Sequence, residues 1–329
     1  MNIKLVAIAK DEAAYLSEWI FHHLYFGFDE IDIYINFTTD KSEELLKKIA
    51  KRYPVNLYYA ENLIPPNSLP NDKFLSERFL SYNKLQARAY SDAVGRTLET
   101  TKTTHIFFLD VDEFWTPICF KKSIKDVLMD IGLPDVASFY WKNKVSEEGL
   151  FQRPFQREVY YLDNPHYKSI VKVSSDIIVM NTHRSLHKSS VDQLGDRYNE
   201  KQLELNSKYA FILHRFQRHE IEYLSMLGRG DPTSPYEFSL KFTRSGFHRP
   251  VNPASISFDE LLVNDYDKEY EKFVIDNQLT DFINEGRKFV IERKNRVVEY
   301  INDHIKICKT IKKVIPGVTL LDVTHDDYK

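Results

Sequence analysis

The sequence predicts an α/β fold in which helices flank a mostly parallel central sheet, followed by a mixed and helical C-terminal part. Over the first 112 residues, short apolar runs alternate with segments whose apolar residues recur every three or four positions, a pattern typical of parallel α/β sheets. After residue 136, four strand-like runs follow one another without a clear helix between them, and helical patterns return from residue 220. We predict one domain over residues 1–250, with a helical extension over residues 251–329 packed on it.

The first half is expected to contribute four strands and three helices. Residues 3–9 form an apolar run with a single lysine, which is typical of a parallel strand buried on both faces. Leu16, Trp19 and Ile20 then recur at helical spacing, and Gly27 ends the pattern. The same reasoning gives strands over 31–35, 55–59 and 105–109, helices over 11–26, 42–53 and 79–97, and a proline-rich loop over 64–70.

The second half gives shorter and less regular signals. Valines and isoleucines near the end of the chain recur at helical spacing among arginines and lysines, which predicts an amphipathic helix packed on the sheet. Contact of its basic face with an anionic membrane surface is the alternative. Strands are expected over 136–141, 159–162, 169–173 and 177–180, and helices over 220–227, 258–263 and 289–311.

Composition excludes several classes of protein. The chain has 45 Lys and Arg against 48 Asp and Glu in 329 residues, so we expect no general nucleic-acid partner. No apolar run approaches the roughly 20 residues of a membrane span, and Asp11 and Glu12 interrupt a signal-peptide pattern. Cys119 and Cys308 are too few for a disulfide framework or a four-cysteine zinc site. We expect a reduced, cytoplasmic enzyme.

Two aspartates follow the strand predicted at 105–109. Asp110 and Asp112 lie two residues apart where the chain leaves the sheet, which is where ligands bind in open α/β sheets. Alternate residues of extended chain share a face, so both carboxylates can converge on one cation. Mn²⁺ or Mg²⁺ suits carboxylates that also meet substrate phosphates. A solvated acidic turn is the alternative.

Four segments in order resemble family 2-like glycosyltransferases, in particular a subgroup related to glycosyltransferase family 92. Residues 6–27, VAIAKDEAAYLSEWIFHHLYFG, resemble the opening of that subgroup, and residues 33–40 resemble its second-strand nucleotide loop. Residues 109–114, LDVDEF, match its Asp-x-Asp-Glu-Phe element, and residues 213–230 resemble its C-terminal motif. The resemblance implies a GT-A fold and sugar transfer from a nucleotide-sugar donor. The sequence departs from the family pattern at Asn36, Arg215, His219 and Met226.

The implied function is that of a metal-dependent, inverting hexosyltransferase. Its donor would be a UDP-sugar and its acceptor a saccharide or glycolipid, in cell-surface polysaccharide or lipopolysaccharide synthesis, with peripheral contact at the inner face of the membrane. One alternative is a nucleotidyltransferase acting on sugar phosphates, although residues 9–13 lack the glycines of a phosphate loop. A non-catalytic carbohydrate-binding protein is the other.

Site residues follow from the motifs and the resemblance together. The metal ligands are expected to be Asp110 and Asp112, completed by His214 or His183, each of which follows a strand-like run. Glu147 or Glu148 is expected to be the catalytic base, with Asp135 also open. The alternatives are a solvated helix start at residues 10–12, a helix cap at Asp40 and solvated arginines. The donor is expected to contact Lys10, Asp11, Glu12, Asp40, Lys168, Arg215 and Arg218.

Basic residues outnumber acidic ones between Arg215 and Arg249. If they line the site together, they form a basic rim that favours an acceptor carrying phosphate or carboxylate. A solvated loop with dispersed charges is the alternative.

Overall fold

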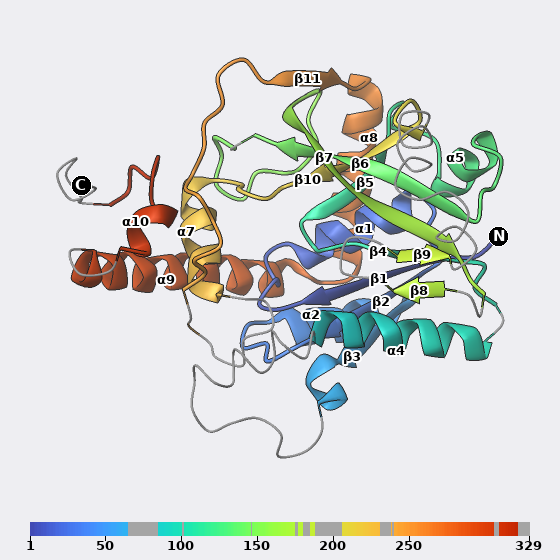
Figure 1. Ribbon diagram of the computed structural model, residues 1–329, viewed down its shortest axis with the longest axis horizontal. Coiled ribbons are helices and arrows are strands. Elements are labelled where there is room, and N and C mark those ends of the chain that lie inside the picture. The colour runs from blue at the N-terminus through green and yellow to red at the C-terminus, as the bar shows by residue number, and fades with distance from the viewer. Residues whose placement is uncertain are drawn as a thin grey trace.

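A computed structural model gives the fold of the chain (Figure 1). It describes residues 1–64, 85–100, 102–145, 147–174, 206–230, 238, 240–305 and 309–321, together with the backbone of 177–179 and 185–187. Several expectations lie outside these residues: His183, most of the 64–70 loop, and parts of the elements predicted at 79–97, 177–180 and 289–311.

A nine-stranded sheet forms the centre of the described structure, in the order β3-β2-β1-β4-β7-β6-β10-β5, with β11 paired to β7. Its strands are β1 (Ile3–Ala9), β2 (Glu30–Ile35), β3 (Val55–Tyr59), β4 (His105–Phe108), β5 (Glu113–Pro117), β6 (Val136–Lys144), β7 (Glu158–Lys172), β10 (Ala210–His214) and β11 (Ala254–Ser257). A separate pair joins β8 (Ile177–Val179) to β9 (Ser185–His187).

Six strands along the main path of the sheet run in the same direction, as does β11, which is antiparallel to β7. β1 pairs in parallel with β2 and β4, and β2 pairs in parallel with β3. β7 is antiparallel to both β4 and β6, and β10 is parallel to β6. β1, β2, β3, β4, β6 and β10 therefore end at the same edge of the sheet. This arrangement confirms the predicted α/β fold class, and it collects the loops after six strands where open α/β sheets bind ligands.

Helices cover both faces of the strands at the N-terminal end of the chain. Ile3, Leu5 and Ala7 of β1 join a core cluster that includes residues of α1 and α2, whereas Val6 and Ile8 join a second cluster with α4. This alternation is the two-residue period of a strand buried on both faces. α4 accordingly lies across β1 from α1 (Figure 1). The helices are α1 (Leu16–Tyr25), α2 (Ser42–Ile49), the short 3₁₀ helix η1 (Ala60–Leu63), α4 (Leu85–Thr100) and α5 (Ile124–Asp130).

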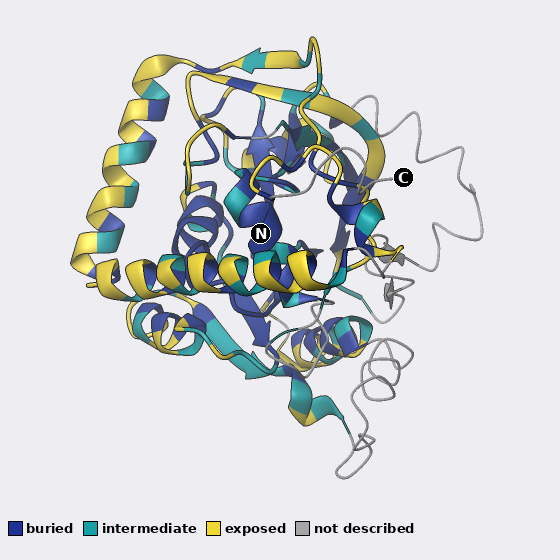
Figure 2. Cartoon of the chain, turned by 90° about the vertical axis from the view of Figure 1, so that its left-hand side faces the viewer, coloured by how far each residue is buried: buried dark blue, intermediate teal, exposed yellow. Residues whose placement is uncertain are grey.

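The C-terminal helices form a third core cluster beside the sheet. Tyr223, Leu224 and Leu227 of α7 pack against Val297 and Ile301 of α9. The outer faces of α8 and α9 are exposed, while the central strands are buried (Figure 2). No helix among the described residues is both long and apolar enough to cross a membrane. The helices are α7 (Glu220–Arg229), α8 (Glu260–Asp276), α9 (Thr280–His304) and α10 (Ile311–Val314).

The main difference from the expected elements is β7. One continuous strand replaces the two predicted at 159–162 and 169–173, because it pairs with β6 along its length through an irregularity at Tyr140 and Trp141. Its middle residues, Asp163 to His166, are polar or proline and are largely exposed, so this stretch of sequence lacks the apolar pattern of a strand. β5 and α5 were not expected, and α8 extends well beyond 258–263.

Candidate active site

The predicted site residues gather at the shared edge of the sheet. Residues 10–12 follow β1, Asp40 follows β2, and residues 110–112 follow β4. Residues 147 and 148 follow β6, and residues 214–218 include the end of β10 and the turn after it. Parallel strand direction brings these loops together, although they are spread over more than 200 residues of sequence.

Asp110 lies in a cluster of charged and polar side chains. Its carboxylate accepts hydrogen bonds from Gln86 Nε2 at 2.8 Å and from Lys168 Nζ at 3.1 Å. Lys168 is buried and also lies 3.2 Å from Glu113 Oε2. Burial lowers the pKa of Lys168, but the carboxylates of Asp110 and Glu113 outweigh it, so the net shift is upward and the side chain stays charged. Lys168 thus forms a charged hydrogen bond with the Asp110 carboxylate.

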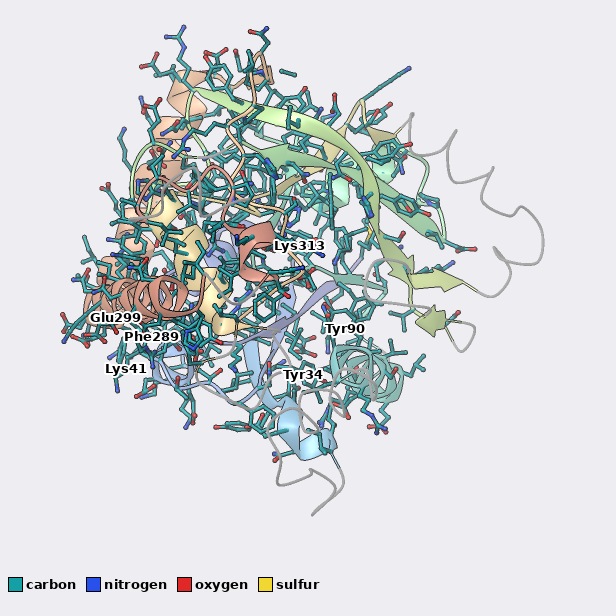
Figure 3. The ribbon with its side chains drawn as sticks, turned by 60° about the vertical axis from the view of Figure 1, so that its left-hand side comes forward. Tyr34, Lys41, Tyr90, Phe289, Glu299 and Lys313 are labelled. Carbon is teal, nitrogen blue, oxygen red and sulfur yellow. The ribbon has the colours of Figure 1, made fainter. Side chains whose placement is uncertain are left out.

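Tyr90 of α4 closes the apolar side of this cluster. Its ring packs on Phe108 with centroids 4.5 Å apart, and its hydroxyl oxygen accepts a hydrogen bond from Gln86 at 2.9 Å. Tyr34 lies on the same face of the sheet (Figure 3). Glu113 is a member of the cluster that the sequence reading did not single out. Burial raises its pKa well above the ordinary value even though Lys168 opposes the shift.

Asp112 pairs with a histidine from a different strand. His214 Nε2 lies 3.7 Å from Asp112 Oδ2, while His214 Nδ1 lies 3.2 Å from Asn143 Oδ1. The imidazole also packs on Trp141, with ring centroids 4.3 Å apart. Burial raises the pKa of Asp112, but His214 and neighbouring arginines outweigh it and hold the pKa below its ordinary range. Asp112 is therefore ionised near neutral pH.

The fit to a metal ion depends on Asp112 and His214. Among the described residues, no group of three or more His, Cys, Asp or Glu side chains could hold a metal ion. Asp110 is engaged with Lys168, and His183 lies outside the described part of the chain. A carboxylate oxygen and an imidazole nitrogen suit Mn²⁺, and such ions commonly complete their coordination with water and substrate phosphate. The pair therefore fits a cation shared with a substrate.

Residues 10–12 are buried, which contradicts the alternative of a solvated helix start. Asp11 has a positive φ of 52°, and its Oδ1 accepts a hydrogen bond from the backbone N–H of Thr39 at 2.8 Å. Its other oxygen lies 3.2 Å from Nη1 of Arg293 in α9. The Glu12 carboxylate pairs with Arg229 and lies 3.7 Å from Arg218 Nη1. The loop after β1 is thus held from several directions.

Asp40 connects the loop after β1 to the start of α2. One carboxylate oxygen accepts a hydrogen bond from the backbone N–H of Ser42 at 2.9 Å, and the other from the N–H of Ala13 at 2.8 Å. Burial raises the pKa of Asp40, and the nearby charge of Asp11 acts in the same direction. These contacts correspond to the helix-capping alternative.

Arg215 and Glu147 bind each other. Two guanidinium nitrogens of Arg215 donate to the Glu147 carboxylate at 2.9 and 2.7 Å, and Lys144 Nζ lies 2.8 Å from the same group. The pair is buried, and the arginine also donates to the carbonyl of Gln152. The predicted roles of Glu147 as base and Arg215 as diphosphate clamp therefore require this pair to open. Glu148 is exposed.

A small polar cavity lies beside Asp112. Its volume of about 20 Å³ has room for one water molecule. Arg218 lies on its wall, with the guanidinium 3.6 Å from the centroid of the Tyr15 ring. Glu222, which the sequence reading did not select, lines the same cavity and accepts from the N–H of Phe151 at 3.0 Å. The sequence feature that could have pointed to Glu222 is its position three residues after His219, where the two side chains form a capping box at the start of α7.

A larger cavity of about 390 Å³ opens near the ends of β6 and β10. Glu147 lines this cavity and its partner Arg215 lines the smaller one, so the ion pair lies between the two. Arg249 on its wall pairs with Glu220 at 2.6 Å. Ordered along the chain, the lining is Val145, Glu147, Glu148, His219, Glu220, Phe247, Arg249 and Pro250.

Comparison with known proteins gives one family match. The model of glycosyltransferase family 92 matches residues 6–245. No curated protein matches the chain.

Several solved structures are similar at low identity. Staphylococcus aureus TarS is 10% identical, with a TM-score of 0.30, and the match covers 69% of this chain and 39% of TarS. TarS 1–349 in complex with UDP is 12% identical, with a TM-score of 0.29, over 99% of this chain and 77% of that one. The galactosyltransferase LgtC, in complex with donor and acceptor sugar analogues, is 15% identical, with a TM-score of 0.23, over 52% and 58% of the two chains.

Proposed function

This chain belongs to glycosyltransferase family 92 and is a glycosyltransferase, and we propose that it uses a UDP-sugar donor with Mn²⁺ or Mg²⁺. The observation that carries the proposal is the Asp112–His214 pair at the carboxyl edge of the sheet, beside a cavity that Arg218 and Arg229 also line. A nucleoside diphosphate leaving group requires a carboxylate that can hold a cation and guanidinium groups nearby, and this place has both.

On the donor side, the nucleotide lies over the loops after β1 and β2, with its diphosphate toward Asp112. Arg218 and Arg229 are paired with Glu12. If one guanidinium turns toward a diphosphate, it exchanges one anionic partner for another, and the second guanidinium remains with Glu12. Asp112 and His214 would hold the cation, which would supply positive charge next to the diphosphate. Lys168 keeps Asp110 in place.

On the acceptor side, the larger cavity receives a saccharide or the sugar of a glycolipid. Its volume of about 390 Å³ lies within the range of sites for small organic ligands. Glu148 is exposed and lines this cavity, so it is the better placed of the two predicted bases to accept the proton of the acceptor hydroxyl. We propose inversion, which requires the acceptor hydroxyl to attack the donor sugar from the side opposite the diphosphate. We extend the proposal to a role in cell-surface polysaccharide or lipopolysaccharide synthesis, in which such acceptors are used.

The test is the release of nucleoside diphosphate from a panel of UDP- and GDP-sugars. We expect Mn²⁺-dependent release from at least one UDP-sugar and its loss in EDTA. Asp112→Asn should lower the rate by about 100-fold or more, because it removes a charged cation ligand. Asp163→Asn is the matched control, because Asp163 is 77% exposed and pairs only peripherally with Lys142. Full activity of the Asp112 variant in chelator would contradict the metal proposal, and transfer of a nucleotidyl group instead would favour the nucleotidyltransferase alternative.

A further inference from the structure

A buried arginine joins the C-terminal helix α9 to the loop after β1. Arg293 is 3% exposed, and its Nη1 lies 3.2 Å from Asp11 Oδ2. Its Nε donates to the hydroxyl of Ser225 in α7 at 3.0 Å. One guanidinium therefore connects two helices to a loop that precedes it by more than 280 residues. A charge this deeply buried is retained only when its partners compensate for lost hydration.

Asp11 is the residue through which this connection reaches the site. Its φ of 52° lies in the left-handed region, which costs free energy for a residue with a side chain and needs support from its surroundings. That support comes from both oxygens, because one accepts from the N–H of Thr39 in the loop after β2 and the other pairs with Arg293. Asp11 thus couples the two loops that the donor is proposed to contact.

Two glycines allow α9 to approach closely enough for this contact. A Cβ on Gly286 would lie 2.5 Å from the backbone nitrogen of Ala14, and a Cβ on Gly228 of α7 would lie 2.5 Å from Cγ2 of Val297. Positions 286, 293 and 297 are seven and four residues apart, so they share one face of α9. Arg293 therefore projects from the face that contacts both α7 and the loop after β1.

We propose that Arg293 is a positioning residue for the donor site, which holds the loops after β1 and β2 in the arrangement that receives the nucleotide. This inference rests on the proposed nucleotide-sugar donor. It adds α9 to the site, whereas the match to family 92 ends at residue 245. Arg293 also lines the small cavity beside Asp112, but its guanidinium is engaged with Asp11 and Ser225, so we assign its effect to the position of Asp11. The loss of Arg293 should weaken donor binding and leave the chemical step nearly unchanged.

The test compares Arg293→Gln and Arg293→Lys with Lys288→Gln, a control on the exposed side of the same helix whose side chain is 66% exposed. The binding probe is UDP with Mn²⁺, measured by calorimetry, and the kinetic readout is donor KM and kcat. We expect Arg293→Gln to weaken UDP binding and raise donor KM by about tenfold, with kcat within about threefold. Arg293→Lys should give an intermediate effect, because it keeps the charge but cannot reach both partners.

Hydrogen exchange in the nucleotide-free protein separates this inference from the proposed function. Arg293→Gln should increase amide exchange in residues 10–13 and 37–41, whereas Lys288→Gln should not. If a nucleotide never binds to the wild-type protein, the donor proposal fails, although the exchange result still reports on the coupling of the loops. If Arg293→Gln is folded and changes neither exchange nor UDP affinity, the inference is wrong. Should that variant unfold, Gly286→Ala, which displaces α9 without removing a charge, carries the same expectations.

Discussion

At the scale of single residues, the site is built from buried charges that bind one another. Lys168 forms ion pairs with Asp110 and Glu113, and Arg215 forms one with Glu147. The Glu12 carboxylate pairs with both Arg218 and Arg229. Each pair fixes the position of a side chain at the edge of the sheet, which a solvated charge cannot do. The cost of desolvation makes such pairs poor sources of net stability but strongly sensitive to the loss of one partner.

Glu147→Gln gives a direct test of this sensitivity. The substitution leaves Arg215 and Lys144 without their anion, and we expect the free energy of unfolding to fall by roughly 3–5 kcal/mol. Urea unfolding measures the change, and Glu148→Gln is the matched control because Glu148 is exposed. A loss of activity with unchanged stability would instead identify Glu147 as the base.

The same pair gives a pH dependence with a defined sign. Burial raises the pKa of Glu147, but Arg215 and Lys144 outweigh it and the net shift is downward. A carboxyl group whose pKa is depressed by folding contributes stability above its ordinary pKa near 4.3 and loses it as the pH falls through the folded value. The wild-type protein should therefore lose more stability on acidification below about pH 4 than Glu147→Gln does.

At the scale of elements, contact between α7 and α9 depends on the absence of a side chain at Gly228. Gly228→Ala places a methyl group 2.5 Å from Val297 Cγ2, so we expect a loss of about 1–3 kcal/mol in stability. Adding Val297→Ala should recover part of that loss, because it removes the atom that clashes. Gly95→Ala in α4 is the control, since a Cβ there meets nothing within 4 Å and should stabilise by about 0.4–1 kcal/mol. Equal thermal melting of the Gly228 and Gly95 variants would contradict the close packing.

Most elements could be predicted from sequence because their periodicity reflects burial. β1 to β3 lie where their patterns predict them, and α9 carries a strong pattern but begins at Thr280 and ends at His304 instead of spanning the predicted 289–311. β7 could not be predicted as one strand. The residues at its centre are exposed and lack an apolar pattern, and only pairing with β6 shows that they belong to a strand. The loops that form the site could be predicted, because they follow the carboxyl ends of strands that the sequence indicates. The Arg215–Glu147 and Arg293–Asp11 pairs could not, because no spacing along the chain indicates that side chains 68 or 282 residues apart will meet.

At the scale of the whole molecule, pairing removes much of the basic excess seen between residues 215 and 249. Arg215, Arg218, Arg229 and Arg249 all have carboxylate partners. The net formal charge of the chain is only −3. The strong positive field that would attract an anionic acceptor is therefore reduced by charges already in the fold.

This distribution favours a neutral saccharide as acceptor over the charged one that the sequence alone suggested. We expect the acceptor KM to change by less than about threefold between roughly 50 and 500 mM NaCl, and Arg244→Ala to leave that salt dependence unaltered. Initial rates at saturating donor measure this directly. A steep rise of acceptor KM with salt, abolished by Arg244→Ala, would restore the charged acceptor.

The contact between α9 and the loop after β1 also sets an order of events during synthesis. Arg293 is synthesised 282 residues after its partner Asp11. At roughly 5–20 residues per second, that interval lasts about 15–55 s. During this time the loop that is proposed to receive the donor lacks one of its supports, although β1 to β4 can already pair. The parallel strands β1 to β4 can therefore pair before α9 docks, whereas the support that Arg293 gives to the loop after β1 is added only when α9 packs in place.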